Sequence, residues 1–270
     1  MTAWLSYHLL SASLAPAEHD PARLFAWTVE TAVQGFVPHA VYAALAERTA
    51  ARGLPMAHVE ARMTGLLALD ANPVAALMAG SGSQQALVRR WNGFNHQAPL
   101  GVHTLMTGPA GAPLQRSERH AGAHSALRQG VTAACVQQLS RAVGRPAHEA
   151  RHASPLLARL AALHAGGGGL HDCTEHLHAQ PAATLAECAR ALGTSARTLQ
   201  RVLEARGLRF TRLRQAVRIT LAGQALRTGS GTLTGVALDA GFFDAAHFAH
   251  AWKQACGLSP SQYRQLALLH

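Results

Sequence analysis

The chain has 270 residues, a length that favours two structural units, each large enough to bury its own hydrophobic core. It carries 24 Lys and Arg against 14 Asp and Glu, so a polyanion is a more natural partner than a cation or a small acidic substrate. The excess is concentrated in residues 184–270, which hold 11 basic and 4 acidic side chains, a net of +7, while residues 1–183 hold 13 and 10.

Almost every basic side chain is an arginine, since Lys253 is the only lysine. Arginine makes paired hydrogen bonds to phosphate or to guanine, which lysine cannot do. A GC-rich coding sequence accounts for the ratio of arginine to lysine, but not for the clustering of charge in the C-terminal third.

The four cysteines are widely spaced and include no Cys-x-x-Cys pair, so the sequence predicts neither a disulfide framework nor a zinc finger. The first residues show no basic stretch leading into an apolar one, and Asp70 interrupts the most apolar segment, residues 63–80. We therefore expect a soluble cytoplasmic protein that does not interact with a membrane.

Residues 1–165 are expected to form a mostly helical unit with minor sheet. Apolar spacing over residues 24–45 predicts helices that break near Pro38. Periodicity predicts three further elements, which are a helix over 84–94, a strand over 100–106 and an amphipathic helix over 124–143.

Four consecutive glycines, residues 166–169, form the clearest break in composition. Glycine loses more backbone entropy on folding than any other residue, so such a tract makes a flexible connector. The sequence therefore predicts one unit over residues 1–165, a linker over 166–169 and a second unit over 170–268.

The second unit contains a helix, a tight turn and a second helix. Thr184 and Glu187 have the spacing of a capping box, and Gly193 permits the left-handed turn that commonly ends a helix. Ser195 starts the next helix, whose apolar positions leave a polar, basic face made by Arg197, Gln200 and Arg201.

The same pattern recurs 48 residues later, where Gly241 matches Gly193. After the turn the offset becomes 49, which matches Leu203 to Trp252. An apolar stripe over residues 210–226 predicts one long helix between the two copies, and a stiff connector of this kind would fix their spacing.

Three segments carry a specific pattern: LGTSARTLQRVL at 192–203, GFFDAAHFAHAWK at 241–253 and GLSPSQYR at 257–264. They closely resemble the two motifs of the AraC/XylS family of bacterial transcription factors, and the match runs from about residue 170 to 266. The resemblance implies a mainly α fold, in which two helix-turn-helix units place their recognition helices in successive major grooves of promoter or operator DNA. It also implies a sequence-specific regulator of transcription that is not an enzyme.

The resemblance places the DNA-contacting residues of the first recognition helix at Ser195, Arg197, Thr198, Gln200 and Arg201. Arginine suits guanine and glutamine suits adenine, so this helix is expected to read base edges. For each arginine, contact with phosphate or solvent alone remains the alternative.

The second recognition helix departs from the family pattern. Its groove-facing positions are Ala245, Ala246, Ala249 and His250, where relatives often carry longer polar groups, with an arginine in place of His250. We expect thymine-methyl contacts, helix N-terminal amides on phosphate and modest polar contacts from His247 or His250. Such contacts add more affinity than specificity.

The remaining positions of the second unit are expected either to contact DNA or to pack in the core. Arg218 corresponds to a characteristic arginine of the family and either bridges the subdomains or reaches phosphate, and Lys253 is a candidate phosphate contact. The sequence assigns a set of aromatic and thiol side chains to the core: Phe242, Phe248, Trp252, Tyr263, Cys188 and Cys256.

Regulators of this family usually attach an effector or dimerisation domain, and residues 1–165 have the right size. Residues 85–95 faintly resemble part of the arabinose-binding-type N-terminal domain, and Trp91, Phe94 and Asn95 are expected either to line a pocket or to pack in the core. An unknown small-molecule effector is therefore the expected ligand, and no cofactor is expected. RNA polymerase and a second copy of the chain are further candidate partners.

Three alternatives stay open. The first is metal sensing, because histidines suggest two candidate sites. One is the i, i+4 pair His120 and His124. The other is a local cluster whose members a helix would distribute around its axis: His171, Cys173, His176 and His178. An enzymatic first unit is the second alternative, although no nucleophile-elbow, phosphate-loop or zinc-protease motif occurs. An architectural DNA-binding protein without effector is the third, and it predicts weak sequence discrimination.

Overall fold

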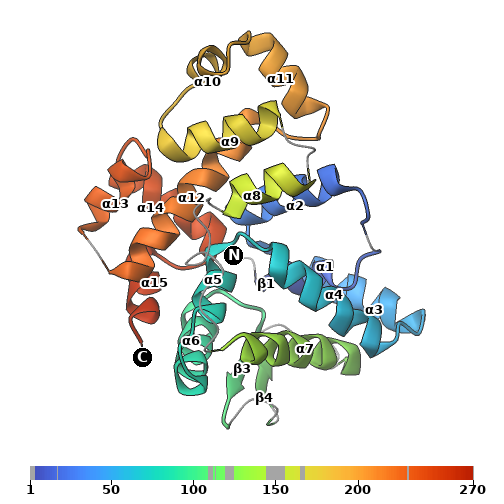
Figure 1. Ribbon diagram of the computed structural model, residues 1–270. Coiled ribbons are helices and arrows are strands. Elements are labelled where there is room, and N and C mark those ends of the chain that lie inside the picture. The colour runs from blue at the N-terminus through green and yellow to red at the C-terminus, as the bar shows by residue number, and fades with distance from the viewer. Residues whose placement is uncertain are drawn as a thin grey trace.

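The computed structural model describes residues 4–16, 18–108, 112, 114–118, 125–143, 156–164, 168–229 and 231–269. These residues form fifteen helices and four short strands, arranged as Figure 1 shows. The fold is mainly α-helical, as the sequence predicts. The strands make two antiparallel pairs, β1 with β2 and β3 with β4. None of the helices in the described ranges combines the length and the apolarity needed to cross a lipid bilayer.

The N-terminal half confirms the predicted break at Pro38, because a short strand separates two helices there. The helix predicted over 84–94, the strand over 100–106 and the helix over 124–143 are also present, while β1, β2 and β4 were not expected. The elements are β1 Leu5–Tyr7, α1 His8–Ala12, α2 Pro21–Val33, β2 Phe36–Pro38, α3 His39–Ala51, α4 Met56–Leu69, α5 Pro73–Ala79, α6 Gln84–Gln97, β3 Val102–Met106, β4 Leu114–Glu118, α7 Ala126–Ala142 and α8 Leu156–His164.

The C-terminal part confirms two helix-turn-helix units on either side of a long helix. Thr184 and Glu187 form the expected capping box, and Gly193 and Gly241 take positive φ values of 66° and 80° in the two turns. The elements are α9 Gly169–Ala179, α10 Leu185–Ala191, α11 Ala196–Glu204, α12 Phe210–Thr228, α13 Leu233–Asp239, α14 Ala245–Cys256 and α15 Pro260–Ala267.

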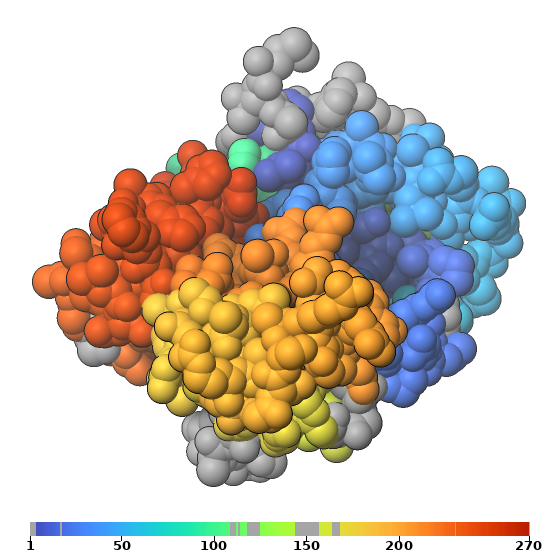
Figure 2. Space-filling model, turned by 90° about the horizontal axis from the view of Figure 1, so that it is seen from above, coloured from blue at the N-terminus to red at the C-terminus, as the bar shows by residue number. Residues whose placement is uncertain are grey.

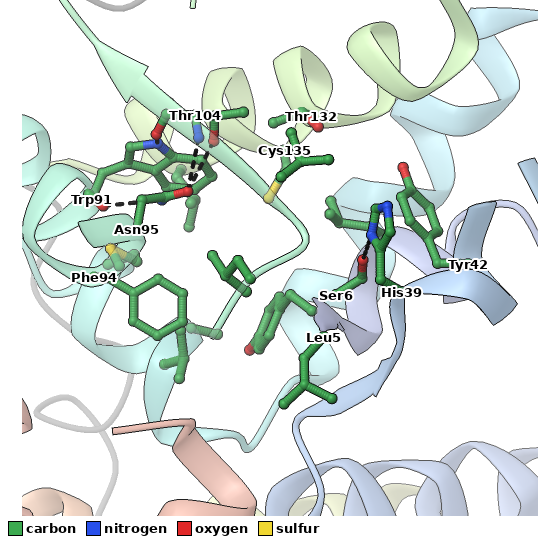
Figure 3. A pocket seen from close by; sticks show the side chains of 18 of the residues that line it. Leu5, Ser6, His39, Tyr42, Trp91, Phe94, Asn95, Thr104, Thr132 and Cys135 are labelled. Carbon is green, nitrogen blue, oxygen red and sulfur yellow. Dashed lines mark hydrogen bonds between the residues drawn. The ribbon is translucent and has the colours of Figure 1, made fainter. Parts of the chain in front are cut away.

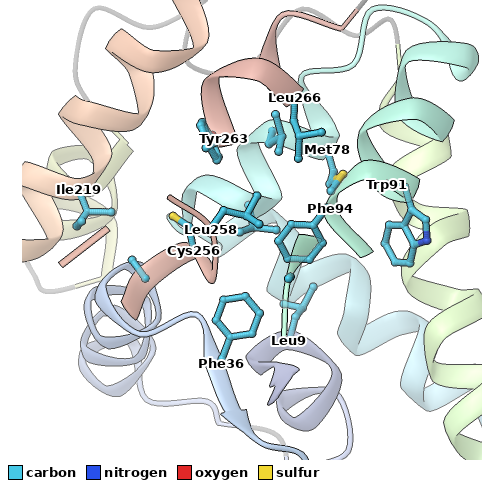
Figure 4. Close-up of a cluster of buried hydrophobic side chains, with 14 of the residues drawn as sticks. Leu9, Phe36, Met78, Trp91, Phe94, Ile219, Cys256, Leu258, Tyr263 and Leu266 are labelled. Carbon is cyan, nitrogen blue, oxygen red and sulfur yellow. The ribbon is translucent and has the colours of Figure 1, made fainter. Parts of the chain in front are cut away.

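Two hydrophobic clusters hold the molecule together, and each combines residues from both sides of the glycine tract. One cluster packs Phe36 and Phe94 with Leu258 and Leu266, as Figure 4 shows. The other packs α2 and α8 against α9, α10, α11 and α12. Within the tract itself, Gly166 and Gly167 lie outside the described residues, and α9 already begins at Gly169. The division into two domains stays a prediction.

Buried hydrogen bonds reinforce the contact between the N-terminal helices and the second helix-turn-helix unit. The Tyr263 hydroxyl donates to the carbonyl oxygen of Pro73 at 2.7 Å. The Arg90 guanidinium donates to the carbonyl oxygens of Leu77, at 3.0 Å, and Ala267, at 2.7 Å. Because these groups are buried, losing one partner would leave a polar atom without a bond and without water. The second unit is therefore firmly docked on α5 and α6.

Candidate nucleic-acid interface and an internal cavity

The first helix-turn-helix unit consists of α10 and α11. Ser195 caps α11, since its hydroxyl oxygen accepts a hydrogen bond from the Thr198 backbone N–H at 3.1 Å. The Ser195 and Thr198 hydroxyls also lie 2.9 Å apart. Leu199 and Leu203 are buried beneath the helix, so the opposite face of α11 is turned to solvent. The local sequence thus fixes which face a ligand can meet.

The exposed face of α11 carries the predicted reading residues. Arg197, Gln200 and Arg201 are all exposed, and their spacing of three and four residues places them on one face of the helix. The Gln200 amide donates to the Glu204 carboxylate at 2.8 Å, so this bond must open before Gln200 can pair with adenine. Figure 2 shows α10 and α11, in yellow and orange, forming the front of the molecule between the red C-terminal helices and the blue N-terminal ones.

The second unit consists of α13 and α14. Asp244 caps α14, because its carboxylate accepts from the His247 backbone N–H at 2.7 Å. Ala246, His247, His250 and Lys253 are exposed, whereas Ala245 and Ala249 are half-buried. The His250 ring nitrogen lies 3.0 Å from the Gln254 side-chain amide. This surface offers backbone amides, two imidazoles and one ammonium group, but no long side chain with paired donors.

The aromatic residues assigned to the core by the sequence are buried, as expected. Ring centroids are separated by 5.1 Å for Phe242 and Phe248, by 5.6 Å for Phe248 and Trp252, and by 4.9 Å for Trp252 and Tyr263. Tilted and edge-to-face contacts at these distances are favourable for aromatic rings. Cys188 and Cys256 are also fully buried, and burial raises the pKa of both thiols.

Arg218 connects the two helix-turn-helix units. Its side chain is 8% exposed, its Nε–H donates to the Pro181 carbonyl oxygen at 2.8 Å, and its guanidinium lies 5.8 Å from the centre of the Phe242 ring. Burial lowers the pKa of Arg218 to about 10, and the charge of Arg214 acts in the same direction. Of the two roles that the sequence leaves open for Arg218, these contacts support the bridge between subdomains.

The turn of the second unit adds a close approach to the same bridge. A Cβ at Gly241 would lie 2.7 Å from the Pro181 carbonyl carbon, so glycine is needed both for the positive φ and for the contact. The loop before α10 and the turn before α14 are thereby held against each other.

One exposed residue of the interface was missed by sequence reasoning. Phe243 is 85% exposed and directly precedes the Asp244 cap of α14. The signal was the second phenylalanine of the pair Phe242-Phe243, since only Phe242 had been assigned to the core. Phe242 is buried and Phe243 lies in solvent beside the face that is expected to meet DNA.

The histidines considered for metal binding form no ligand cluster in the described part of the chain. Among the described residues, no three His, Cys, Asp or Glu side chains are placed to hold a metal ion. His171 is bonded to the Ala158 carbonyl oxygen at 3.1 Å, and Cys173 is buried. Burial lowers the pKa of His178 to about 4. His120 and His124 lie outside the described residues.

A cavity of about 70 Å³ lies in the N-terminal part, between β1, α3, α5, α6, β3 and α7 (Figure 3). Trp91, Phe94 and Asn95 line it. The Trp91 indole N–H donates to the Thr104 carbonyl oxygen at 2.8 Å, and the Asn95 side-chain oxygen accepts from the Thr104 backbone N–H at 3.0 Å. These three residues are therefore both packed and pocket-lining.

Comparison with known proteins agrees with the helix-turn-helix geometry. A family model described as "Helix-turn-helix domain" matches residues 188–266, which is under a third of the chain. No curated protein matches the chain.

Solved structures of two proteins show limited similarity. ToxT from Vibrio cholerae is 22% identical over 37% of this chain and 38% of that chain, with a TM-score of 0.34. ToxT with a bound unsaturated fatty acid is 22% identical over 37% and 36%, with a TM-score of 0.33. This chain thus spans under two fifths of both ToxT chains. The transcriptional regulator CdpR from Pseudomonas aeruginosa is 14% identical over 96% and 97%, with a TM-score of 0.30.

The family match covers the two units that hold the motifs at 192–203 and 241–264. Both units have a capped recognition helix with an exposed face, and a buried arginine joins them. These findings identify residues 188–266, in the C-terminal part of the chain, as a helix-turn-helix domain.

Proposed function

We propose that this protein is a transcriptional regulator of the AraC/XylS type. It would bind a specific two-part DNA site, in which α11 reads the base sequence and α14 anchors the complex, and a small molecule in the N-terminal cavity would control binding. The observation that carries the proposal is the contrast between the two exposed helix faces. Arg197 and Arg201 on α11 have long side chains with paired donors, whereas α14 presents Ala245 and Ala246.

The first recognition helix is suited to reading base edges because its long polar side chains are exposed to solvent and do not pack in the core. Arg197 and Arg201 lie one helical turn apart on the exposed face of α11, so both can enter one major groove. A guanidinium that pairs with guanine discriminates against other bases by about 1–3 kcal/mol. Two such contacts are enough to define the first half of the site.

The second recognition helix is suited to anchoring because it is docked on the N-terminal core. Alanine side chains cannot donate to base edges, but the N-terminal amides of α14 can meet a phosphate, and Lys253 offers a positive charge. Contacts of this kind set the position of the protein on the duplex without selecting a sequence.

Control by a small molecule is supported by the position of the cavity. Val74 and Met78 of α5 and Phe94 of α6 line it, and the same two helices hold α15 through Pro73 and Arg90. Gly93 on α6 also packs directly against Leu266 of α15. A molecule that moves α5 or α6 would therefore move the second DNA-binding unit. Contacts with RNA polymerase and formation of a homodimer remain further predictions.

Selection of binding sites from random duplex DNA by the full chain tests the proposal. We expect an enriched motif with two parts about one helical turn apart, of which one is strongly and one is weakly specified. Binding should weaken steeply with salt, because counterions are released as phosphates are neutralised. Binding without an enriched motif would identify an architectural protein instead.

A further inference from the structure

The internal cavity has a wall chemistry that restricts what it can hold. We propose that it binds a compact apolar molecule, about the size of one six-membered ring, whose hydrogen-bond-accepting head group pairs with the hydroxyl of Tyr42. This inference rests on the proposed control by an effector and names the chemical class of that effector.

The volume and the walls limit the ligand to a single ring, which enters only when a wall side chain moves. At about 70 Å³, the cavity has roughly half the volume of an engineered apolar cavity that binds benzene. Met78 forms part of the wall, and its unbranched side chain can move aside to admit a single ring. Most other wall residues are apolar and give no partner to a second polar group: Leu5, Leu10, Leu67, Val74, Phe94 and Leu139.

The place of the head group follows from the hydrogen bonds inside the cavity. Ser6 and His39 are paired at 2.8 Å, the Thr132 hydroxyl donates to the Arg128 carbonyl oxygen at 3.0 Å, and Asn95 is bonded to Thr104. Tyr42, in contrast, is 3% exposed, and its hydroxyl has no hydrogen-bond partner in the described part of the protein. A buried hydroxyl without a partner is unfavourable, and a ligand that accepts its hydrogen bond removes this penalty.

Figure 3 shows the Tyr42 ring beside His39, at the end of the cavity where α3 approaches α7. Thr132 and Cys135 of α7 also line the cavity, as does Arg116, which lies opposite Thr104 in the register of β3 and β4. The polar end of the ligand would therefore lie against α3 and α7, while its apolar body would extend toward Phe94.

The charge around Tyr42 selects the sign of the head group. Burial raises the pKa of Tyr42, while the guanidinium groups of Arg116 and Arg128 act in the opposite direction. Both guanidinium groups are positively charged and favour a negative charge at this hydroxyl. The carboxylate of Asp70, which follows α4, is engaged with the Tyr7 hydroxyl at 2.9 Å and with His8 at 3.1 Å. A carboxylate head group is therefore favoured over a neutral one, and an ammonium group is disfavoured.

Three probes with the same fluorinated ring test the inference on the full chain by fluorine NMR titration: 4-fluorobenzoate, fluorobenzene and 4-fluorobenzylammonium. We expect 4-fluorobenzoate to bind at least about tenfold more tightly than the other two. Equal binding of all three, tightest binding of the ammonium compound, or no binding of any probe would each overturn the inference.

Variants of the cavity give matched controls. Tyr42→Phe should abolish the preference for 4-fluorobenzoate and leave the binding of fluorobenzene unchanged. Thr132→Val removes a hydroxyl that already has a partner in the protein, so it should keep the preference. Ala75→Leu should weaken all three probes, because it fills the space. A preference for 4-fluorobenzoate that persists in Tyr42→Phe would show that another protein group binds the carboxylate.

A DNA-binding titration with and without saturating 4-fluorobenzoate separates this inference from the proposed function. If the probe binds through Tyr42 and DNA affinity stays the same, the ligand class stands and effector control fails. If the protein selects a DNA sequence but binds none of the probes, the ligand class is wrong and sequence-specific DNA binding stands.

Discussion

The side-chain amide of Asn72 donates a hydrogen bond of 2.9 Å to the carbonyl oxygen of Ala255 in α14, across 183 residues of sequence. The same amide donates to the Thr31 carbonyl oxygen at 2.9 Å, and Asn72 is fully buried. A Cβ at Gly35 would clash with both Ala255 and Asn72, so this junction has no spare room. The position of the second recognition helix thus depends on a residue between α4 and α5.

Replacing Asn72 by alanine should destabilise the whole protein. The variant removes the side-chain donor of the Thr31 carbonyl oxygen and one of the two donors of the Ala255 carbonyl oxygen, which keeps the Gly35 backbone N–H at 3.2 Å. It also removes the cap of α5, where Asn72 accepts from the Val74 backbone N–H at 2.9 Å. We expect a loss of about 2–4 kcal/mol in the free energy of unfolding, measured with urea, together with weaker DNA binding.

Ser83→Ala is the matched control, because Ser83 caps α6 from an exposed position. It should cost about 1 kcal/mol and leave DNA affinity unchanged. Equal losses of stability and affinity in the two variants would show that the Asn72 junction does not position α14.

The buried imidazole of His178 gives the protein a defined sensitivity to acid. Burial lowers the pKa of His178 to about 4, below the value near 6.5 of an unfolded histidine. The unfolded chain therefore takes up the proton first as the pH falls. The stabilising contribution of the neutral ring is complete above about pH 6.5 and is lost progressively down to about pH 4.

Urea unfolding at a series of pH values between 4 and 7 measures this loss. His178→Gln should flatten the slope in that window, whereas His19→Gln, at an exposed position, should leave it unchanged. A slope that persists in His178→Gln would assign the titration to other groups.

Phe243 is expected to contact thymine methyl groups at the second half of the DNA site. Its ring is 85% exposed and directly precedes the Asp244 cap of α14, whose first turn carries the small exposed side chain of Ala246. An apolar surface in the major groove recognises the 5-methyl group of thymine. Replacing thymine by deoxyuridine in the second half-site should therefore weaken binding of the native protein.

Phe243→Ala should bind the thymine and deoxyuridine duplexes alike. Leu238→Ala is the control, since Leu238 is also exposed, at 55%, but lies on α13. An unchanged difference between the two duplexes in Phe243→Ala would remove this residue from the interface.

Lys253 is expected to neutralise one phosphate. Lys253→Ala should weaken binding to all sequences alike and reduce the slope of log affinity against log salt by about one unit. His250→Ala should have a smaller effect, because its ring nitrogen already lies 3.0 Å from the Gln254 side-chain amide. Titrations at several salt concentrations measure both slopes, and an unchanged slope for Lys253→Ala would place its ammonium away from the phosphates.

The local features of the DNA-binding part could be predicted because each depends on neighbours in sequence. The capping box of Thr184 and Glu187, the glycine turns and the buried faces of α11 and α14 follow from patterns within ten residues. The lining role of Trp91, Phe94 and Asn95 was also anticipated as one of two alternatives.

Features that depend on distant contacts could not be predicted in the same way. No local pattern shows that Asn72 meets Ala255 or that the Tyr42 hydroxyl is left without a partner. The choice between bridge and phosphate contact for Arg218 needed the position of Pro181 and Phe242. The strands β1 and β2 were missed because each has only three residues, too few to show an alternating pattern.

The most direct test of the central claim is selection of DNA sites from a random pool by the native chain and by the variants Arg197→Ala and Arg201→Ala. Arg52→Ala is the control, since Arg52 is an exposed arginine in the N-terminal part of the chain, directly after α3. The account predicts that Arg197→Ala and Arg201→Ala each lose about 1–3 kcal/mol at one preferred base and relax the motif only in the first half-site, while Arg52→Ala keeps it. Uniform loss of affinity in both variants, with a motif that changes in His250→Ala instead, would make α14 the reader and contradict the account.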